Sequence, residues 1–297
     1  MGLNEFTTQL SNCRLTRIDL DLEHYYYGDG EFYVSLTHIL DIGAPFPEGL
    51  RQYLRRSSEE ESLELLTMTK DRGTKLHRAL EHLTSGLELY LEDYPTVYEK
   101  DALVSYIRTL RFLFPDNRLP KDTRTELLVA DSKRKVGGTL DIKSTADKRR
   151  LDALLAGSTA LKLENDELVF KKPLIGRKRL VRFVLDYKFT GRSAYNHKVQ
   201  ATKYRQMNNL SYTKEPKANY AYIWRYSPKH KLHFDMQDAS LHRQKKVTPA
   251  AFNRIYTTAL EYLGGFPEPP ELVVFPDSVR LFGQVTKKGK QDVRPIA

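Results

Sequence analysis

The stretch that decides the fold is FVLDYKFTG, Phe183–Gly191. It opens with three apolar residues, as a buried β-strand does, and then places Asp186 and Lys188 one residue apart. Side chains alternate between the two faces of a strand, so the acid and the lysine share a face while Tyr187 points to the other. The pattern therefore predicts a core strand that ends either in a surface ion pair or in half of a reactive site.

An exposed ion pair of this kind contributes less than about 1 kcal/mol. A second strand pattern upstream, GGTLDIK, carries another acid, Asp141, at its end. If the two strands pair as neighbours, both carboxylates and Lys188 converge. Two carboxylates bind hard divalent cations such as Mg²⁺ or Mn²⁺ and leave positions open for water and phosphate. A lysine beside them can stabilise an anionic transition state, so these groups suit phosphodiester hydrolysis.

The remaining patterns predict a mixed α/β fold with a helical N-terminal part, in the order helices, strands, helix, strands, helix. Leu76, Leu80, Leu83 and Leu87 follow helical spacing. Glu31–Ile42 begins as a strand and becomes helical near Thr37. Strands are predicted over 123–132, 136–144, 179–190, 218–227 and 231–237, a small hairpin over 161–172, and helices over 57–94 (one long or two shorter), 102–114, 147–157, 193–212 and 248–265.

These elements fit one domain over 1–280, with a helical region at about 35–115 and a basic tail at 281–297. Asp141 and Asp186 are 45 residues apart (186 − 141), so an insertion at about 145–178 separates the two strands that carry them. Whether this insertion leaves the two strands paired is the open question of the sequence. Its basic clusters either line a nucleic-acid path or form a solvated loop.

Composition favours a polyanionic partner. The 48 Lys and Arg exceed the 38 Asp and Glu by +10, and 18 Tyr and 13 Phe provide aromatic faces that suit stacking on unpaired bases. A single cysteine, Cys13, excludes internal disulfides and cysteine-rich zinc or iron–sulfur sites. The sequence has neither a signal-peptide pattern nor an 18-residue apolar run, so we expect a cytoplasmic protein without a membrane partner.

Four segments in order resemble the PD-(D/E)XK nuclease superfamily: RGTKLHRALEHL, TELLVADSKRKVGGTLDI, FVLDYKFTG and KVQATKYRQM. The order is similar to that of the RecB-like branch, which includes RecB nuclease domains, CRISPR-associated exonucleases and the mitochondrial genome maintenance exonuclease. The resemblance spans about Ser35 to Met207. It implies a restriction-endonuclease-like core, with a central mixed sheet flanked by helices, and metal-dependent DNA cleavage at the sheet edge.

The resemblance also implies residue roles. Asp141 and Asp186 match the two metal-binding acids, and Lys188 matches the catalytic lysine. His77 matches a histidine that contacts a metal from an upstream helix, and Glu126 matches a less constant catalytic acid on the preceding strand. The expected cofactor is Mg²⁺ or Mn²⁺, as two ions. The four cysteines of the iron–sulfur members are absent, which excludes that subgroup.

Three further residues are expected to bind substrate. Gln200 and Tyr204 match a Q-x-x-x-Y element, and their i, i+4 spacing places them on one helix face. Gly138 follows Gly137, and glycines let a phosphate backbone approach closely. Each feature also has an ordinary structural interpretation: a polar stripe for the helix pair, a bulge or turn for the glycines, and a core-flanking histidine beside the leucine stripe for His77.

The resulting functional hypothesis is a metal-dependent deoxyribonuclease. We expect an exonuclease acting on single-stranded DNA or DNA ends in replication, recombination or repair, in a phage or bacterium. The alternatives left open are an endonuclease, an RNA nuclease, and a non-catalytic nucleic-acid-binding module on the same fold.

Overall fold

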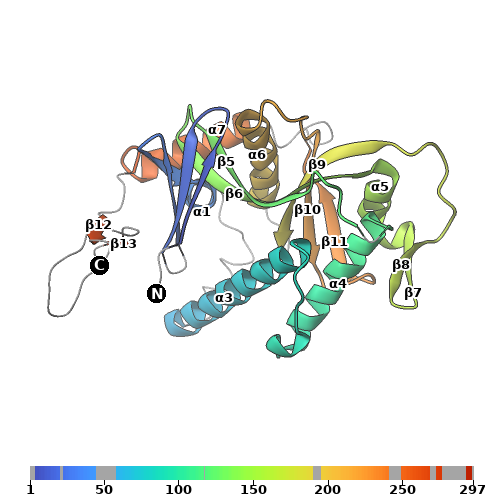
Figure 1. Ribbon diagram of the computed structural model, residues 1–297. Coiled ribbons are helices and arrows are strands. Elements are labelled where there is room, and N and C mark those ends of the chain that lie inside the picture. Colours follow the sequence, from blue (N-terminus) through green and yellow to red (C-terminus); the bar gives the residue numbers. More distant parts are fainter. Residues whose placement is uncertain are drawn as a thin grey trace, which may run out of the picture.

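A nine-stranded mixed sheet forms the centre of the part of the chain that the structure describes (Figure 1). The structure is a computed structural model, and it describes residues 4–20, 23–44, 58–116, 118–189, 195–240, 249–267, 272–275 and 292–295. The strand order is β1-β2-β3-β4-β6-β9-β10-β11, and β5 pairs with β6 off this path. The β4–β6 and β9–β10 pairs are parallel and the others are antiparallel. The predicted α/β class with a mixed central sheet is confirmed.

The strands of this sheet are β1 (Asn4–Gln9), β2 (Arg14–Leu20), β3 (Glu23–Gly28), β4 (Glu31–Ser35), β5 (Arg124–Asp131), β6 (Val136–Asp147), β9 (Leu180–Lys188), β10 (Tyr220–Tyr226) and β11 (Phe234–Asp238). Two small hairpins lie outside the sheet, β7 (Leu161–Glu164) with β8 (Glu167–Phe170) and β12 (Leu272–Phe275) with β13 (Asp292–Pro295). The described helices are α1 (Leu36–Gly43), α3 (Glu59–Thr84), α4 (Val97–Leu113), α5 (Lys148–Ala156), α6 (Tyr195–Ser211), α7 (Pro249–Tyr262) and the short 3₁₀ turns η1 (Leu91–Asp93) and η2 (Gly157–Thr159).

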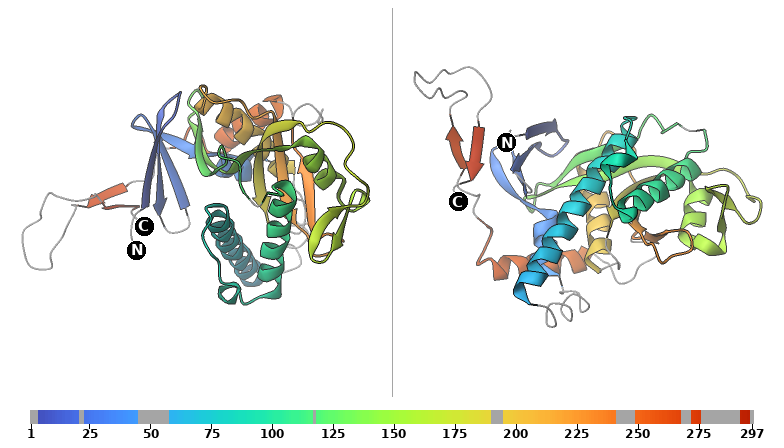
Figure 2. Two further views of the ribbon diagram at one scale, coloured as in Figure 1. Left: turned by 45° about the vertical axis from the view of Figure 1, so that its right-hand side comes forward. Right: turned by 90° about the horizontal axis from the view of Figure 1, so that it is seen from below.

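Helices cover both faces of the sheet, and each face has its own core (Figures 1 and 2). On one face, α3 and α4 place Leu76, Leu80 and Tyr106 against strands β6, β9 and β10. On the other face, α1, α6 and α7 pack on the same strands through a second buried cluster that includes Met207 and Ile255. The predicted site residues on β6 and β9 therefore lie in a layer that helices cover on both sides.

The N-terminal part begins with strands rather than helices. β1 to β4 form an antiparallel meander that extends the central sheet, and the region at about 35–115 then supplies α1, α3 and α4. The change from strand to helix predicted near Thr37 occurs at Leu36. The predicted leucine stripe is shorter than expected, because α3 ends at Thr84 and Leu87 is exposed beyond it.

The insertion does not interrupt the pairing of the two acid-bearing strands. β6 runs on to Asp147 and β9 starts at Leu180, so the predicted limits of 145–178 begin three residues too early and end one residue too early. Six consecutive residue pairs join β6 to β9 before the insertion leaves the sheet. The predicted hairpin is present, and Asn165 and Asp166 both adopt positive φ, as a two-residue hairpin turn requires.

Most of the predicted tail at 281–297 and the end of the opening stretch, Gly191, lie outside the described residues. Within the tail, Asp292–Pro295 forms β13. In the part of the chain that the structure describes, no helix is both long enough and apolar enough to cross a lipid bilayer.

Candidate active site

A fork in the central sheet sets the position of the predicted site. β5 follows one edge of β6 from Val136 to Lys143, so β4 and β9 share the other edge. β4 pairs with Val136 and Gly137, and β9 pairs from Ile142 onwards. Among the described residues, 138–141 therefore have no strand partner on that edge. Beyond this point β9 pairs with β10 but not with β6, so the sheet opens between residues 138–141 of β6 and the end of β9. This opening is the fork.

Three acids lie in one row across this fork. The residue pairs on either side of Glu126 place it opposite Asp141, and continuing the β6–β9 register places Asp186 opposite Asp141 from the other side. Both β5 and β6 are irregular here. Glu126 has φ of 47°, which is strained for a residue other than glycine. Leu140 packs on the α6 side of the sheet, whereas Ile142 packs on the α3 side, so β6 changes face at Asp141.

The Asp141 carboxylate accepts a hydrogen bond from a backbone N–H of β9 at the point where the β6–β9 ladder has ended. The Tyr187 N–H donates to its Oδ2 at 2.6 Å, and His77 on α3 places Nδ1 3.6 Å from its Oδ1. Burial favours the neutral acid, but His77, Lys188 and the Tyr187 N–H together hold the pKa of Asp141 below its usual value. Burial likewise opposes charge on His77, yet Asp141 raises the pKa of the imidazole. Each member of the pair therefore favours the charged form of the other.

Asp186 is the more deeply buried acid, with 2 % of its surface exposed. Lys188 Nζ lies 2.8 Å from its Oδ2, in an ion pair that lacks the angular geometry of a hydrogen bond. Burial raises the pKa of Asp186 to about 6, and the charge of Asp141 adds to this increase while Lys188 opposes it. The surface ion pair considered from the sequence is thus excluded, because both partners are largely buried.

Glu126 belongs to the same electrostatic group. Burial raises its pKa to about 7, the charge of Asp141 adds to the increase, and Arg17 opposes it. The site thus combines Asp141, whose pKa is lowered, with Asp186 and Glu126, whose pKa values are raised. Closely spaced carboxylates repel one another, and a bound cation would relieve this repulsion.

Gln200 and Tyr204 share the predicted face of α6, and Gln200 Nε2 lies 3.5 Å from the Tyr204 hydroxyl. Both are buried, and the Tyr204 ring lies on Gly138, where an added Cβ would meet its Cε1 at 2.7 Å. On Gly137 an added Cβ would meet the Tyr26 ring at 2.7 Å. The glycine pair is therefore required for two tyrosine rings to approach β6, and Gly138 is covered instead of being open to a phosphate.

The donors fit a hard divalent cation, though not a closed protein cage. Within the described ranges, no group of three His, Cys, Asp or Glu side chains is placed to hold a metal ion by itself. Mg²⁺ commonly uses one or two carboxylates and completes its coordination with water and substrate phosphate. Asp141 and Asp186, opposed in register at an opening of the sheet, match that requirement, with His77 and Glu126 close to the pair.

Two neighbours of the site were missed from the sequence. Arg17 on β2 donates to Glu126 Oε2 at 3.2 Å, and this contact spans 109 residues of sequence. On the other side, Arg225 of β10 is the register neighbour of Lys188. Both lower the pKa of half-buried His197, which desolvation chiefly brings to about 3. No local pattern marks either arginine, because their partners are distant in the chain.

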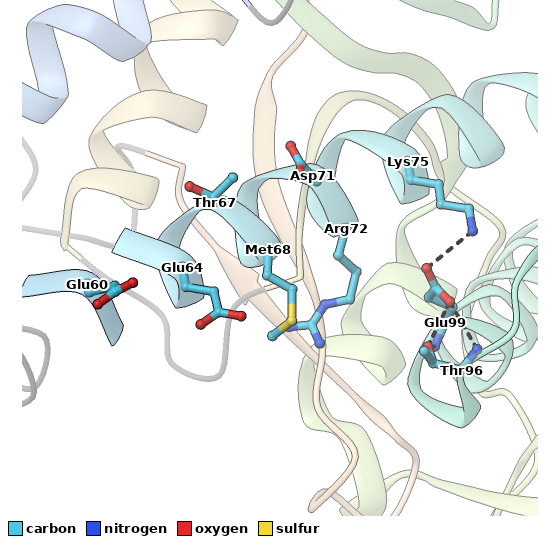
Figure 3. Close-up of a pocket in the computed structure, with 9 residues that line it drawn as sticks. All are labelled: Glu60, Glu64, Thr67, Met68, Asp71, Arg72, Lys75, Thr96 and Glu99. Carbon is cyan, nitrogen blue, oxygen red and sulfur yellow. Dashed lines mark hydrogen bonds and ion pairs between the residues drawn. The ribbon is translucent and has the colours of Figure 1, made fainter. Parts of the chain in front are cut away.

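A hollow elsewhere on the molecule contains none of the predicted site residues. It has a volume of about 790 Å³ and lies between the first half of α3 and the start of α4 (Figure 3). Lys75 and Glu99 line it, with Nζ and Oε1 3.5 Å apart, and further acids and Arg72 complete a wall of mixed charge. Such a wall has no single sign of charge to attract a polyanion, so the fork remains the candidate site.

No family model matches this sequence, and no curated protein matches it either.

Proposed function

We propose that the protein is a metal-dependent DNA nuclease of the PD-(D/E)XK type. The observation that carries this proposal is the convergence of Asp141, Asp186 and Lys188 where β6 and β9 separate. Nearby, His77 Nδ1 lies 3.6 Å from Asp141 Oδ1, and Glu126 lies opposite Asp141 in the ladder. The chain order of these groups supports the RecB-like branch proposed from the sequence.

Asp141 and Asp186 would hold the divalent cation, with His77 in its neutral form as a further ligand. When bound, the cation would lower the pKa of a coordinated water and neutralise charge on the scissile phosphate. The metal-free site resists full ionisation, as the raised pKa values of Asp186 and Glu126 indicate. We therefore expect cation binding to release protons near neutral pH.

Lys188 and Glu126 provide the remaining chemistry. The Lys188 ammonium group, with 14 % of its side chain exposed, can donate to a non-bridging phosphate oxygen or to the attacking water. As the water oxygen bonds to phosphorus, it loses a proton, and the departing sugar oxygen gains one when its bond to phosphorus breaks. Glu126 titrates near pH 7, which suits a group that accepts the proton of the attacking water.

The net charge of +10 supports a nucleic-acid substrate. The insertion adds exposed basic residues, among them Lys172, Arg177 and Lys178, to this charge. Within the proposal, the preferred substrate is DNA with a free end or a single strand. This preference comes from the family likeness, and the substrate comparison below tests it separately from hydrolysis itself.

The test is digestion of DNA labelled at each end in turn, single-stranded and double-stranded, with EDTA, Mg²⁺ or Mn²⁺. We expect hydrolysis with either metal, none in EDTA, and none by Asp186→Ala, whereas exposed Asp116→Asn acts like the wild type. Covalently closed circles that are cut as fast as linear DNA would exclude an exonuclease. Binding of DNA by the wild type without hydrolysis in any divalent metal would overturn the proposal in favour of a binding module.

A further inference from the structure

The N-terminal meander contacts the acids of the candidate site through Arg17 of β2. Its Nη1 donates to Glu126 Oε2 at 3.2 Å and to Thr139 Oγ1 at 3.0 Å. Thr139 lies on β6 two residues before Asp141, and the Tyr26 hydroxyl of β3 is 3.0 Å from the same Oγ1. Two strands of the meander thus contact the acid-bearing strands beside the fork.

Asp19 fixes the orientation of the Arg17 guanidinium group independently of Glu126. Asp19 accepts two hydrogen bonds, from Nε at 2.6 Å and from Nη2 at 2.9 Å, and His24 Nδ1 lies 2.8 Å from Asp19 Oδ1. The Arg17 side chain is 14 % exposed. A planar guanidinium held on one edge by a bidentate carboxylate directs its remaining N–H groups along a defined line. The opposite edge therefore presents Nη1 to Glu126.

Both the backbone conformation and the charge of Glu126 are unfavourable at this position, so its side chain needs a stabilising contact. Its backbone is in the left-handed region, while the residues on either side keep their ladder pairs with β6. Its carboxylate is repelled by Asp141 directly across the ladder. Arg17 is the one cation that contacts this carboxylate among the described residues, and it contacts Oε2.

We infer that Arg17 is a positioning residue that holds Glu126 in its orientation at the fork, so that the N-terminal meander is part of the catalytic apparatus. The inference rests on the proposed function for its kinetic consequence. Arg17 acts through Glu126 and contacts neither the phosphate nor the cation. Its loss should therefore lower kcat while leaving KM for DNA and its salt dependence unchanged.

The experiment is a double-mutant cycle in the full chain with Arg17→Met, Glu126→Gln and both changes. We expect Arg17→Met to lower kcat about ten-fold or more in the wild-type background, and less than about two-fold when Glu126→Gln is already present. Arg14→Met, on the same strand with an exposed side chain, should behave as the wild type. Equal losses in both backgrounds, or a raised KM with a changed salt slope, would overturn the inference.

A second readout separates this inference from the proposed function. Urea unfolding in EDTA, followed by the fluorescence of buried Trp224, should give non-additive midpoint shifts for the same cycle whether or not the protein cleaves DNA. Additive shifts would overturn the contact itself, and absence of hydrolysis by the wild type would overturn the proposed function alone. If the Arg17→Met variant does not fold, the Arg17→Lys variant replaces it in the kinetic experiment. A lysine cannot hold Asp19 and Glu126 together, so its kcat should still fall, and wild-type kcat would overturn the inference.

Discussion

Asp186→Asn should stabilise the metal-free protein while abolishing hydrolysis. The carboxyl group of Asp186 has a pKa of about 6 in the folded protein against 3.8 as the ordinary value. Below pH 3.8 both states hold the proton, and this group has no effect on stability. Between pH 3.8 and 6 the unfolded state ionises first, so the free energy of unfolding falls as pH rises. The difference of about 2 pH units corresponds to a penalty of roughly 3 kcal/mol above pH 6.

Asparagine has nearly the same shape and carries no charge, so it removes this penalty. We expect the variant to match the wild type near pH 4 and to exceed its stability by up to about 3 kcal/mol at pH 7.5. Loss of the charge opposite Lys188 reduces the gain, which makes this value an upper bound.

The assay is urea denaturation in EDTA at several pH values. Trp224 provides an internal reporter, because its side chain is fully buried and its indole N–H donates to Thr109 Oγ1 at 3.1 Å. Asp71→Asn, an exposed acid on α3, is the matched control and should show no pH-dependent gain. A variant that is no more stable than the wild type at pH 7.5 would refute the argument that ionised Asp186 destabilises the metal-free fold. Added Mn²⁺ should then stabilise the wild type more than Asp186→Asn, since binding to the folded state raises stability.

Two further predictions concern the surroundings of Asp186. Lys188→Met should lower kcat by about 10²–10³ while Mn²⁺ binding, measured by calorimetry, persists, and loss of binding would contradict an electrostatic role. Gly138→Ala should lower the free energy of unfolding by about 1–3 kcal/mol in urea titrations, because its Cβ would meet the Tyr204 ring at 2.7 Å. The control Gly73→Ala, on α3 with open space around it, should be neutral or stabilising, and equal effects of the two alanines would contradict the packing argument.

The sequence predicted the elements that local patterns encode. Strands β5, β6, β9, β10 and β11 follow from runs of apolar residues bounded by polar turns, and α6 and α7 follow from helical spacing. The order of Asp141, Asp186 and Lys188 along the chain was also informative. Asp141, expected at the end of a strand, instead lies in the middle of β6, and the antiparallel β6–β9 register places it opposite Asp186 near the end of β9. By contrast, β1 to β3 gave no prediction, since their mixed polar and aromatic residues are stabilised by pairing within the meander.

Side chains that meet across long stretches of sequence could not be predicted. Arg17 is an ordinary strand arginine until β2 is folded beside β5, and the role of Gly137 and Gly138 depends on tyrosines from β3 and α6. The positive φ of Glu126 could not be predicted either, because it occurs opposite the position at which β6 changes face, and neither irregularity has a local sequence signal. Register and face, unlike periodicity, are properties of paired strands.

The insertion illustrates why chain separation is a poor guide to site geometry. Between Asp147 and Leu180 the connection has 32 residues, yet each doubling of a loop adds only about 0.6 kcal/mol of closure entropy. Compared with a four-residue turn, this is three doublings, or about 2 kcal/mol. Leu151 and Leu154 of α5 and Leu161 of β7 are buried in the α3–α4 core, and burial of one such side chain offsets a cost of that size. The six-pair ladder then fixes where β6 and β9 separate, and the fork with its acids follows from the ladder, whatever the length of the insertion.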